Sequence, residues 1–170
     1  MMNGAVVLIP LAIIRILIPQ FLGLNYNQRI TAFAPMTDKQ KQIYYVYQIV
    51  QVFLIAVPFY YNIQWASIWN YLGAILLVAG SILLLIAILD FRQEGLVTSG
   101  VYRWSRHPMY VAYYIYYLGA ALLMNAWIYA ILLVIFIISG HTIVLAEEAW
   151  CHETYPEAYK DYCQTTRRYI

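Results

Sequence analysis

The chain has 170 residues and a formal net charge of +2 at pH 7, and apolar side chains dominate its composition. Hydrophobic residues make up 64% of the chain and charged residues only 11%, whereas a typical soluble domain has about 25% charged residues. This composition excludes a water-soluble globule, because lipid must solvate much of the exterior. The small net charge gives no support to nucleic-acid binding. The length fits one integral membrane domain over 1–170.

The sequence predicts an all-α polytopic membrane helix bundle. A helix needs roughly 20 apolar residues to cross the bilayer, and strands would leave backbone groups unpaired in lipid. The first apolar stretch is expected to be a retained span, because it has neither the basic start nor the cleavage site of a signal peptide. A C-terminal cytosolic helix is expected over 147–163, with Pro156 bending or restarting it. The five stretches that are long enough, or nearly so, are 4–24, 43–61, 67–89, 108–124 and 126–146.

The distribution of basic residues predicts the orientation of the bundle. The connections at 62–66 and at Asn125 contain no Lys or Arg, and Arg15 lies inside the first span. Because basic residues concentrate on the cytoplasmic side, we expect the N-terminus outside and the C-terminus in the cytosol. Any site built from the basic connections would then face the cytosol. The remaining basic residues lie in the first connection, the third connection and the tail: Arg29, Lys39, Lys41, Arg92, Arg103, Arg106, Lys160, Arg167 and Arg168.

The connection before the fourth span carries a candidate anion site. Residues 96–110 read Leu-Val-Thr-Ser-Gly-Val-Tyr-Arg-Trp-Ser-Arg-His-Pro-Met-Tyr. Pro108 fits the first turn of a helix, where its missing N–H costs nothing. Arg106 and His107 would then lie beside the positive end of that helix, a position that favours a carboxylate or phosphate. The alternative is that both side chains only anchor the helix in the headgroup region.

Polar side chains near the end of the fifth span are the other candidates. Glu147 and Glu148 follow that span and can bind hydroxyl or ammonium groups of a ligand, or pair with an arginine such as Arg103, Arg106 or Arg168. His141 lies about 9 Å deeper, where a titratable side chain is either functional or bonded to a neighbouring helix. Asp90 is expected to have a structural role. Four tyrosines at helical spacing either pack or line a cavity: Tyr110, Tyr113, Tyr114 and Tyr117.

No metal centre is expected. The two cysteines, Cys151 and Cys163, lack the CxxC spacing of a zinc site. A cytosolic location of the tail argues against a disulfide between them.

The C-terminal part of the chain resembles the isoprenylcysteine carboxyl methyltransferase and phospholipid methyltransferase family. The first motif is Gly-x-Tyr followed by Arg-His-Pro-x-Tyr, and the second is Glu147-Glu148 followed by Tyr159, Tyr162 and a basic end. The resemblance divides the domain into N-terminal helices and loops (1–94) and a cofactor-binding methyltransferase region (95–170). It implies a membrane methyltransferase that uses S-adenosylmethionine, produces S-adenosylhomocysteine and methylates a lipophilic small-molecule or lipidated acceptor.

The resemblance also implies roles for individual residues. Arg106, His107 and Glu148 are the expected catalytic group, and His141 and Tyr114 are the candidates for acceptor binding. No general base follows from the resemblance: a carboxylate acceptor needs none, whereas an amine or thiol would need His107, His141 or a carboxylate. The residues expected to contact the cofactor are Leu96, Val97, Tyr102, His107, Pro108, Met109, Tyr110 and Glu147.

Two departures from the family pattern bear on the acceptor, and one comparison with another enzyme class bears on the alternatives. Isoprenylcysteine enzymes usually carry an arginine where this chain has Ile143, and their terminal Val-Pro-Arg-Phe appears here as 166–169, Thr-Arg-Arg-Tyr. Sterol reductases that use NADPH end in a similar Arg-His-Pro-x-Tyr segment, but tend to have a glycine and an acidic residue where this chain has Val111-Ala112. A reductase-like module and a non-catalytic membrane subunit are therefore the alternatives to a methyltransferase.

Overall fold

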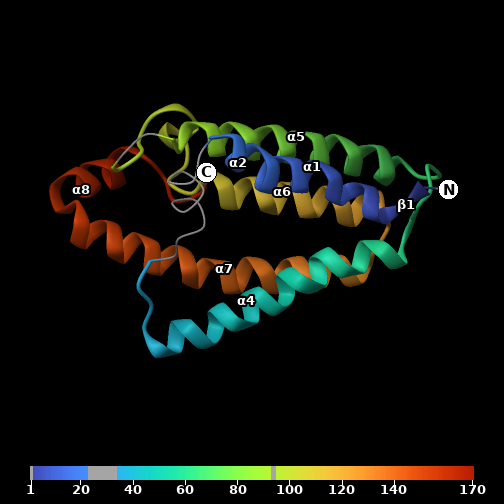
Figure 1. Cartoon of the computed structure of the whole chain (residues 1–170), viewed down its shortest axis with the longest axis horizontal. Helices are drawn as coiled ribbons and strands as arrows, with labels where there is room; N and C mark the ends of the chain where they lie inside the picture. Colours follow the sequence, from blue (N-terminus) through green and yellow to red (C-terminus); the bar gives the residue numbers. More distant parts are fainter. Residues whose placement is uncertain (1, 23–33, 93–94) are drawn as a thin grey trace.

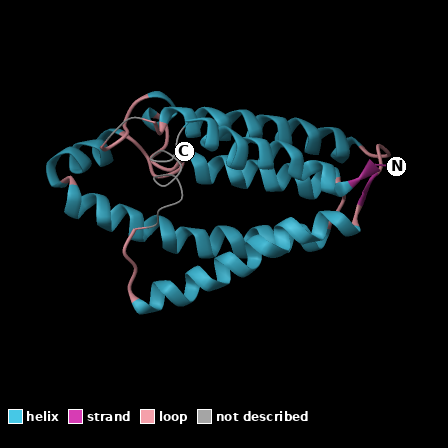
Figure 2. Ribbon diagram, viewed as in Figure 1, coloured by secondary structure: helices cyan, strands magenta, loops and turns pink. Residues whose placement is uncertain are grey.

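The computed structural model describes residues 2–22, 34–92 and 95–170, and these residues form a bundle of long helices (Figures 1 and 2). The first helical segment joins η1 (Gly4–Val7), α1 (Leu8–Ala12), a π-helical turn η2 (Ile13–Leu17) and α2 (Ile18–Leu22). The other elements, in chain order, are α4 (Asp38–Ala56), η3 (Val57–Tyr60), α5 (Ile68–Asp90), η4 (Gly100–Arg103), α6 (Pro108–Leu123), α7 (Trp127–Thr154) and α8 (Pro156–Thr165). A short antiparallel pair, β1 (Met2–Asn3) and β2 (Asn62–Ile63), closes the end opposite α8.

The helices support an integral membrane protein. Among the described residues, four helices are long and apolar enough to cross a membrane: Gly4–Leu22, Asp38–Tyr60, Ile68–Asp90 and Trp127–Thr154. The fourth expected span is observed as α6, which has 16 residues and a length of about 24 Å, shorter than the hydrocarbon core. The all-α class is therefore confirmed, while a count of five spans and their orientation stay predictions.

Two helices extend beyond the apolar stretches that predicted them. α4 begins at Asp38, not 43, because Thr37 and Gln40 form a capping box: the backbone N–H of Thr37 donates to Oε1 of Gln40 (2.8 Å), and that of Gln40 donates to Oγ1 of Thr37 (3.4 Å). α7 continues past 146 to Thr154, and Pro156 begins α8. The expectation that Pro156 restarts the helix after the last span is confirmed.

α5 and α6 approach each other most closely through glycines. A Cβ atom at Gly80 would lie 2.6 Å from the backbone nitrogen of Tyr116, and Cβ atoms at Gly73 and Gly119 would collide with the facing backbones. Asn70 on α5 also donates to the carbonyl of Leu123 on α6, at 2.9 Å. Small residues give this kind of contact because helices in lipid associate through close packing and hydrogen bonds.

α4 packs against α7 in the other half of the bundle, as Figure 1 shows. The rings of Tyr47 and Phe136 stack with centroids 4.7 Å apart. The hydroxyl of Tyr129 donates to the carbonyl of Leu54 at 2.9 Å. The bundle thus has two halves, with α6 and α7 meeting between them, and this junction holds the candidate site.

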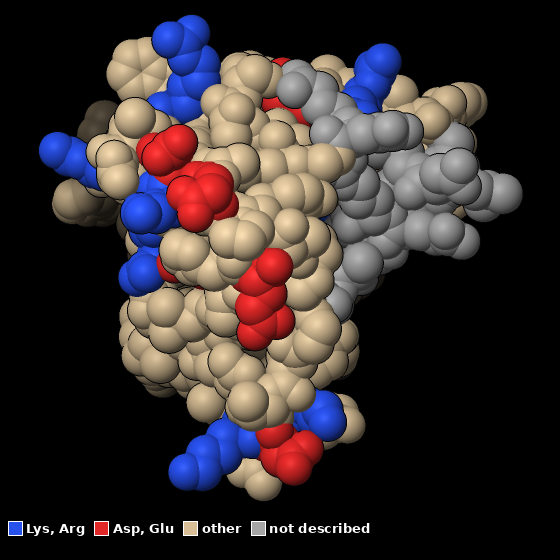
Figure 3. Space-filling model, turned by 90° about the vertical axis from the view of Figure 1, so that its left-hand side faces the viewer, with Lys and Arg blue, Asp and Glu red and all other residues tan. Residues whose placement is uncertain are grey.

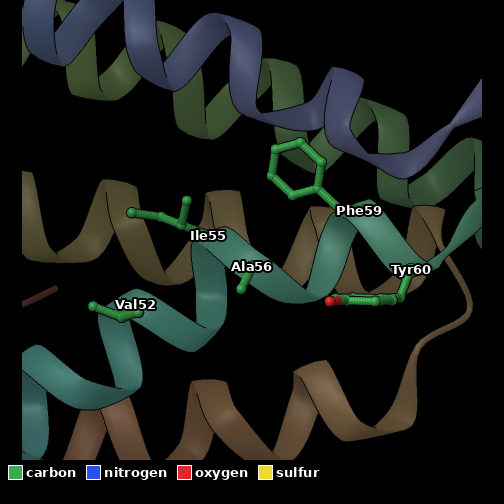
Figure 4. Close-up of a pocket in the computed structure, with 5 residues that line it drawn as sticks. All are labelled: Val52, Ile55, Ala56, Phe59 and Tyr60. Atoms are coloured by element: carbon green, nitrogen blue, oxygen red, sulfur yellow. The ribbon is translucent and has the colours of Figure 1, made fainter.

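The charged side chains gather at one end of the bundle, which Figure 3 shows face on. α4 and α6 begin at this end, and α5 and α7 finish there, so the basic connections lie together. Among the described residues, the expected separation of basic connections from the uncharged end is confirmed, while Arg29 lies outside the described residues. At the uncharged end, an apolar groove of about 350 Å³ is lined by residues of α4 and η3 (Figure 4): Val52, Ile55, Ala56, Phe59 and Tyr60.

Candidate active site

The loop before α6 is held by the end of α5. The carboxylate of Asp90 accepts a hydrogen bond from the backbone N–H of Val101 at 2.8 Å. Gly100 has φ +59°, and a Cβ atom there would collide with the Asp90 carboxylate. Only glycine combines this left-handed conformation with this close contact at no steric cost. The glycine of the first motif therefore shapes the loop, and Asp90 has the structural role expected for it.

Tyr102 fixes the same loop to its neighbours. Its side chain is buried, and its hydroxyl donates to the carbonyl of Ala87 at 3.4 Å while its ring packs against Phe91. Its carbonyl accepts a hydrogen bond from the hydroxyl of Tyr162 on α8 at 2.5 Å. The side chain of Tyr102 is thus directed toward α5, and its expected cofactor contact stays a prediction.

His107 connects the two motifs. It is the residue before Pro108, which begins α6 as the sequence predicts. Nδ1 of His107 lies 3.5 Å from Glu147, and Nε2 lies 3.3 Å from Glu148. Because both ring nitrogens face carboxylates, the imidazolium form with two N–H donors satisfies the geometry. Burial lowers the pKa of His107, but the hydrogen bonds and charges of Glu147 and Glu148 outweigh it, and the net result is a raised pKa.

Glu148 is the centre of a buried ion-pair network. Its two oxygens accept from the guanidinium of Arg106 at 2.8 Å and from that of Arg168 at 2.7 Å, in addition to the contact with His107. Burial lowers the pKa of the Arg106 guanidinium, but the hydrogen bond and the charge of Glu148 together with other nearby groups outweigh it, and the pKa is raised. For Arg168, its own hydrogen bond to Glu148 is the main cause of a raised pKa. The expected catalytic group Arg106, His107 and Glu148 is therefore brought together by the fold, but as a set of mutual partners.

Glu147 is more accessible than its neighbour. Its side chain is 27% exposed, compared with 10% for Glu148. The hydroxyl of Tyr110 donates to Glu147 at 2.8 Å. Two residues that are expected to contact the cofactor, one on α6 and one on α7, are therefore hydrogen-bonded to each other. A carboxylate has about four acceptor positions, and Glu147 retains capacity for further donors. Of the two glutamates, Glu147 is the one placed to contact a ligand.

The C-terminal tail, residues 166–170, covers the loop before α6. The backbone N–H groups of Arg106 and His107 donate to the carbonyls of Arg167 (2.9 Å) and Arg168 (3.2 Å). The guanidinium of Arg106 also donates to the carbonyl of Thr166 at 2.6 Å. The tail therefore supplies both backbone acceptors and a charged side chain to the site.

Tyr169 of this tail joins His141 to the rest of the cluster. Nδ1 of His141 is hydrogen-bonded to the Tyr169 hydroxyl at 2.8 Å. The Tyr169 ring centroid lies 6.0 Å from that of His141, 6.4 Å from that of His107 and 6.2 Å from that of Tyr114. The two candidates for acceptor binding, His141 and Tyr114, thus lie against one aromatic ring at the side of the site that is deeper in the bundle.

The other sequence candidates have mainly packing contacts. Met109 packs against an apolar cluster between the first helical segment and α5, Pro108 and Val97 are buried, and Leu96 is half-buried. The rings of Tyr113, Tyr114 and Tyr117 pack against Phe136, as expected if the tyrosine stripe has a packing role. The cofactor contacts expected of Leu96, Val97, Pro108 and Met109 stay predictions.

The sequence indicates one of the two contacts between the tail and α7. It offers Arg168 as a candidate partner of the glutamates, but it does not indicate the contact between Tyr169 and His141. The two residues are separated by 28 positions and by the turn between α7 and α8. The only signal in the sequence is the cluster of basic and aromatic residues over 166–169, which says that the tail has a polar partner without saying which one.

No curated protein and no solved structure matches the chain. A family model does match: residues 87–158 match the model for phospholipid methyltransferases, a family of membrane methyltransferases. The matched region starts in the last turns of α5, contains the loop, α6 and α7, and ends within α8. The match agrees with the resemblance carried by the two motifs, and the matched region contains both His107 and Glu147.

Proposed function

We propose that this protein transfers a methyl group from S-adenosylmethionine to a lipophilic acceptor in the membrane. One observation carries the proposal: His107 lies 3.5 Å from Glu147 and 3.3 Å from Glu148, although about 40 residues and an entire helical hairpin separate them. The two motifs thus meet at one end of the bundle, in the region that matches the family. The convergence of a few polar groups from separate elements is one feature of sites that bind small molecules.

The groups at this site fit the charges of S-adenosylmethionine. That molecule carries a carboxylate, an ammonium group, ribose hydroxyls and a sulfonium. Glu147, which is partly exposed, suits the ammonium group or a hydroxyl. The positive N-terminal end of α6, which begins at Pro108, suits the carboxylate. The site therefore offers complementary charges to both ends of the amino-acid moiety. When bound, the cofactor supplies an electrophilic methyl group.

The contribution of the protein to this reaction is mainly alignment. Methyl transfer is an in-line displacement, so holding the reactants in the right geometry supplies much of the rate. Glu147 and Tyr110 are bonded to each other across α6 and α7, which fixes the ligand-facing carboxylate. Glu148, Arg106 and Arg168 hold His107 and the tail in place around it. Cytosol-facing placement of the site is the orientation that the basic connections favour.

The environment of the site bears on the acceptor. Isoprenylcysteine enzymes usually have an arginine at the position of Ile143, which here is apolar and 1% exposed. This position supplies no cation for an acceptor carboxylate. The proposed acceptor is therefore a membrane-dissolved molecule other than a prenylated cysteine. Apolar helix surfaces around the site give such a molecule a lateral route from the bilayer.

A titration with S-adenosylhomocysteine in detergent tests the proposal. Wild-type protein should bind it, and Glu147→Gln should bind it about 10- to 100-fold more weakly, because a charge-assisted hydrogen bond contributes about 1.5–3 kcal/mol. Glu157→Gln, a change of the same type on the exposed surface of α8, is the matched control and should bind as wild type does. A parallel titration with NADPH addresses the reductase alternative.

The outcomes separate the alternatives. Folded wild-type protein that binds NADPH and not S-adenosylhomocysteine would refute the proposal in favour of a reductase-like module. Folded protein that binds neither ligand would favour a non-catalytic membrane subunit. Equal affinity of wild type and Glu147→Gln for S-adenosylhomocysteine would place the cofactor elsewhere.

A further inference from the structure

The site contains several groups that are able to take up a proton, and their surroundings differ. The question of which group receives a proton rests on the proposed function, because it arises only if the protein is a methyltransferase. Methylation of an amine, thiol or hydroxyl releases a proton, and a group beside the acceptor has to receive it. The candidates near the site are His107, His141 and the two glutamates. An imidazole whose two nitrogens both donate to carboxylates, or a carboxylate already engaged by several donors, is a poor proton acceptor.

His107 and Glu148 are engaged in this way. Both ring nitrogens of His107 face carboxylates, so this side chain has no free nitrogen to receive a proton. Glu148 is shared by two guanidinium groups, from Arg106 and Arg168, besides His107. Protonating Glu148 would cost the energy of those ion pairs. Glu147 accepts from Tyr110 and His107, and it is the carboxylate proposed to bind the cofactor.

His141 differs from these groups. Its Nδ1 is bonded to Tyr169 at 2.8 Å, and within residues 2–22, 34–92 and 95–170 the structure gives its Nε2 no hydrogen-bond partner. The side chain is half-buried and precedes Glu147 by six residues, so it lies about 9 Å deeper along α7. In the proposed function, a lipophilic acceptor would approach from this side, within the apolar part of the bundle. In the tautomer whose Nδ1–H donates to the Tyr169 oxygen, Nε2 has a free lone pair and is able to accept a proton.

We infer that His141, oriented by Tyr169, receives the proton of the acceptor. The attacking nitrogen, sulfur or oxygen forms a bond to the methyl carbon while the bond from that carbon to the cofactor sulfur breaks, and the sulfur keeps the electron pair. The proton of the attacking atom passes to Nε2 of His141. Nδ1–H of the same ring stays bonded to the Tyr169 oxygen. Tyr169 acts as a positioning residue, and the acceptor is one whose attacking atom carries a proton.

Variants at the two positions test the inference in detergent micelles. The acceptor probes are dioleoylphosphatidylethanolamine for an amine, hexadecanethiol for a thiol and N-acetyl-S-farnesylcysteine for a carboxylate. With the amine or the thiol, His141→Ala should lower the methylation rate by about 10²- to 10⁴-fold, the usual contribution of a positioned proton acceptor. Tyr169→Phe should lower it by about tenfold, the effect of one hydrogen bond. Added imidazole should restore part of the His141→Ala rate.

The matched controls are His152→Gln and Tyr71→Phe, at exposed positions away from the site. Both should keep the wild-type rate. The substitutions at His141 and Tyr169 change the acceptor side of the site and leave the proposed cofactor contacts in place. S-adenosylhomocysteine should therefore bind with the wild-type affinity, within about threefold, to all three variants: His141→Ala, His141→Gln and Tyr169→Phe. This binding also shows that the variants are folded.

Chemical modification gives a readout that does not depend on activity. Diethyl pyrocarbonate reacts with an unprotonated imidazole nitrogen, and mass spectrometry locates the adduct. His141 should be modified in the wild type, faster in Tyr169→Phe, and protected by the amine or thiol probe but not by S-adenosylhomocysteine alone. A structural role of His141 does not predict protection by the acceptor.

The inference would be overturned if His141→Ala methylates the amine and thiol probes at the wild-type rate, or if it loses S-adenosylhomocysteine binding as completely as it loses activity. It would also be overturned if wild-type protein that binds S-adenosylhomocysteine methylates only the carboxylate probe or none of the three. Wild-type protein that fails to bind S-adenosylhomocysteine would instead refute the proposed function itself.

Discussion

Replacing Glu148 by glutamine tests how much the buried network stabilises the fold. The change keeps the shape of the side chain and removes its charge, which leaves Arg106 and His107 without their shared carboxylate. The Arg106 and Glu148 side chains are 11% and 10% exposed, and removing one partner of such a buried pair costs about 3–5 kcal/mol. Arg168 is 37% exposed, and its pairing with Glu148 contributes about 1 kcal/mol or less, because solvent screens it.

Thermal unfolding in detergent measures this difference. For a chain of this length, 1 kcal/mol corresponds to about 2–4 °C in Tm, so Glu148→Gln should lower Tm by about 6–20 °C and Arg168→Gln by about 4 °C or less. Glu157→Gln on α8, where the side chain is exposed, is the control for the substitution itself. Unchanged Tm in Glu148→Gln, or an equal loss in Arg168→Gln, would refute the claim that the buried pair dominates the network.

Three further predictions concern pH and glycine positions. Since the pKa of His107 is raised in the folded protein, its stabilising contribution is complete below about pH 6.5, the unfolded value, and is lost as pH rises through the folded pKa. Tm measured from pH 6 to 9 should therefore fall, and should fall less in His107→Gln. Gly80→Ala should destabilise by about 1–3 kcal/mol, because a Cβ atom would press on the Tyr116 backbone; in the same denaturant titration, Ala79→Leu on the exposed side of α5 should have little effect. Gly100→Ala should weaken S-adenosylhomocysteine binding by about tenfold, since a displaced loop moves His107; wild-type affinity would show that the loop tolerates the change.

The apolar stretches of the sequence predicted where the helices lie but not where they end. The expected span at 67–89 corresponds closely to α5, since both of its flanks are polar. α7 runs on to Thr154 because nothing in its polar last turns breaks a helix before Pro156. Hydropathy detects the edge of the apolar region, whereas a helix ends where its backbone hydrogen bonds end. The same reasoning explains the polar start of α4 at the Thr37 cap.

The sequence predicted the main contact of the candidate site, between His107 and Glu147, but not all of the residues that take part in the site. Motif order and helix direction were sufficient to expect His107 near Glu147, because both lie at the same ends of antiparallel helices. The sequence could not predict that Glu148 pairs with the arginines while Glu147 stays more accessible, since this depends on which carboxylate Arg106 and Arg168 reach. The contact between Tyr169 and His141 depends on how the tail folds back after α8, and no local pattern encodes that path.

The hairpin that carries the site has mechanical consequences. The chain passes from α6 to α7 through a short turn around Asn125, which has φ +51° and lies at the end of the bundle far from His107 and Glu147. With an arm of about 24 Å, a tilt of about 5° between the two helices at this turn moves their charged ends by about 2 Å. A movement of that size is enough to open or close the gap between a donor and an acceptor. A change of angle at Asn125 would therefore act on the spacing of His107 and Glu147 from the far end of the bundle.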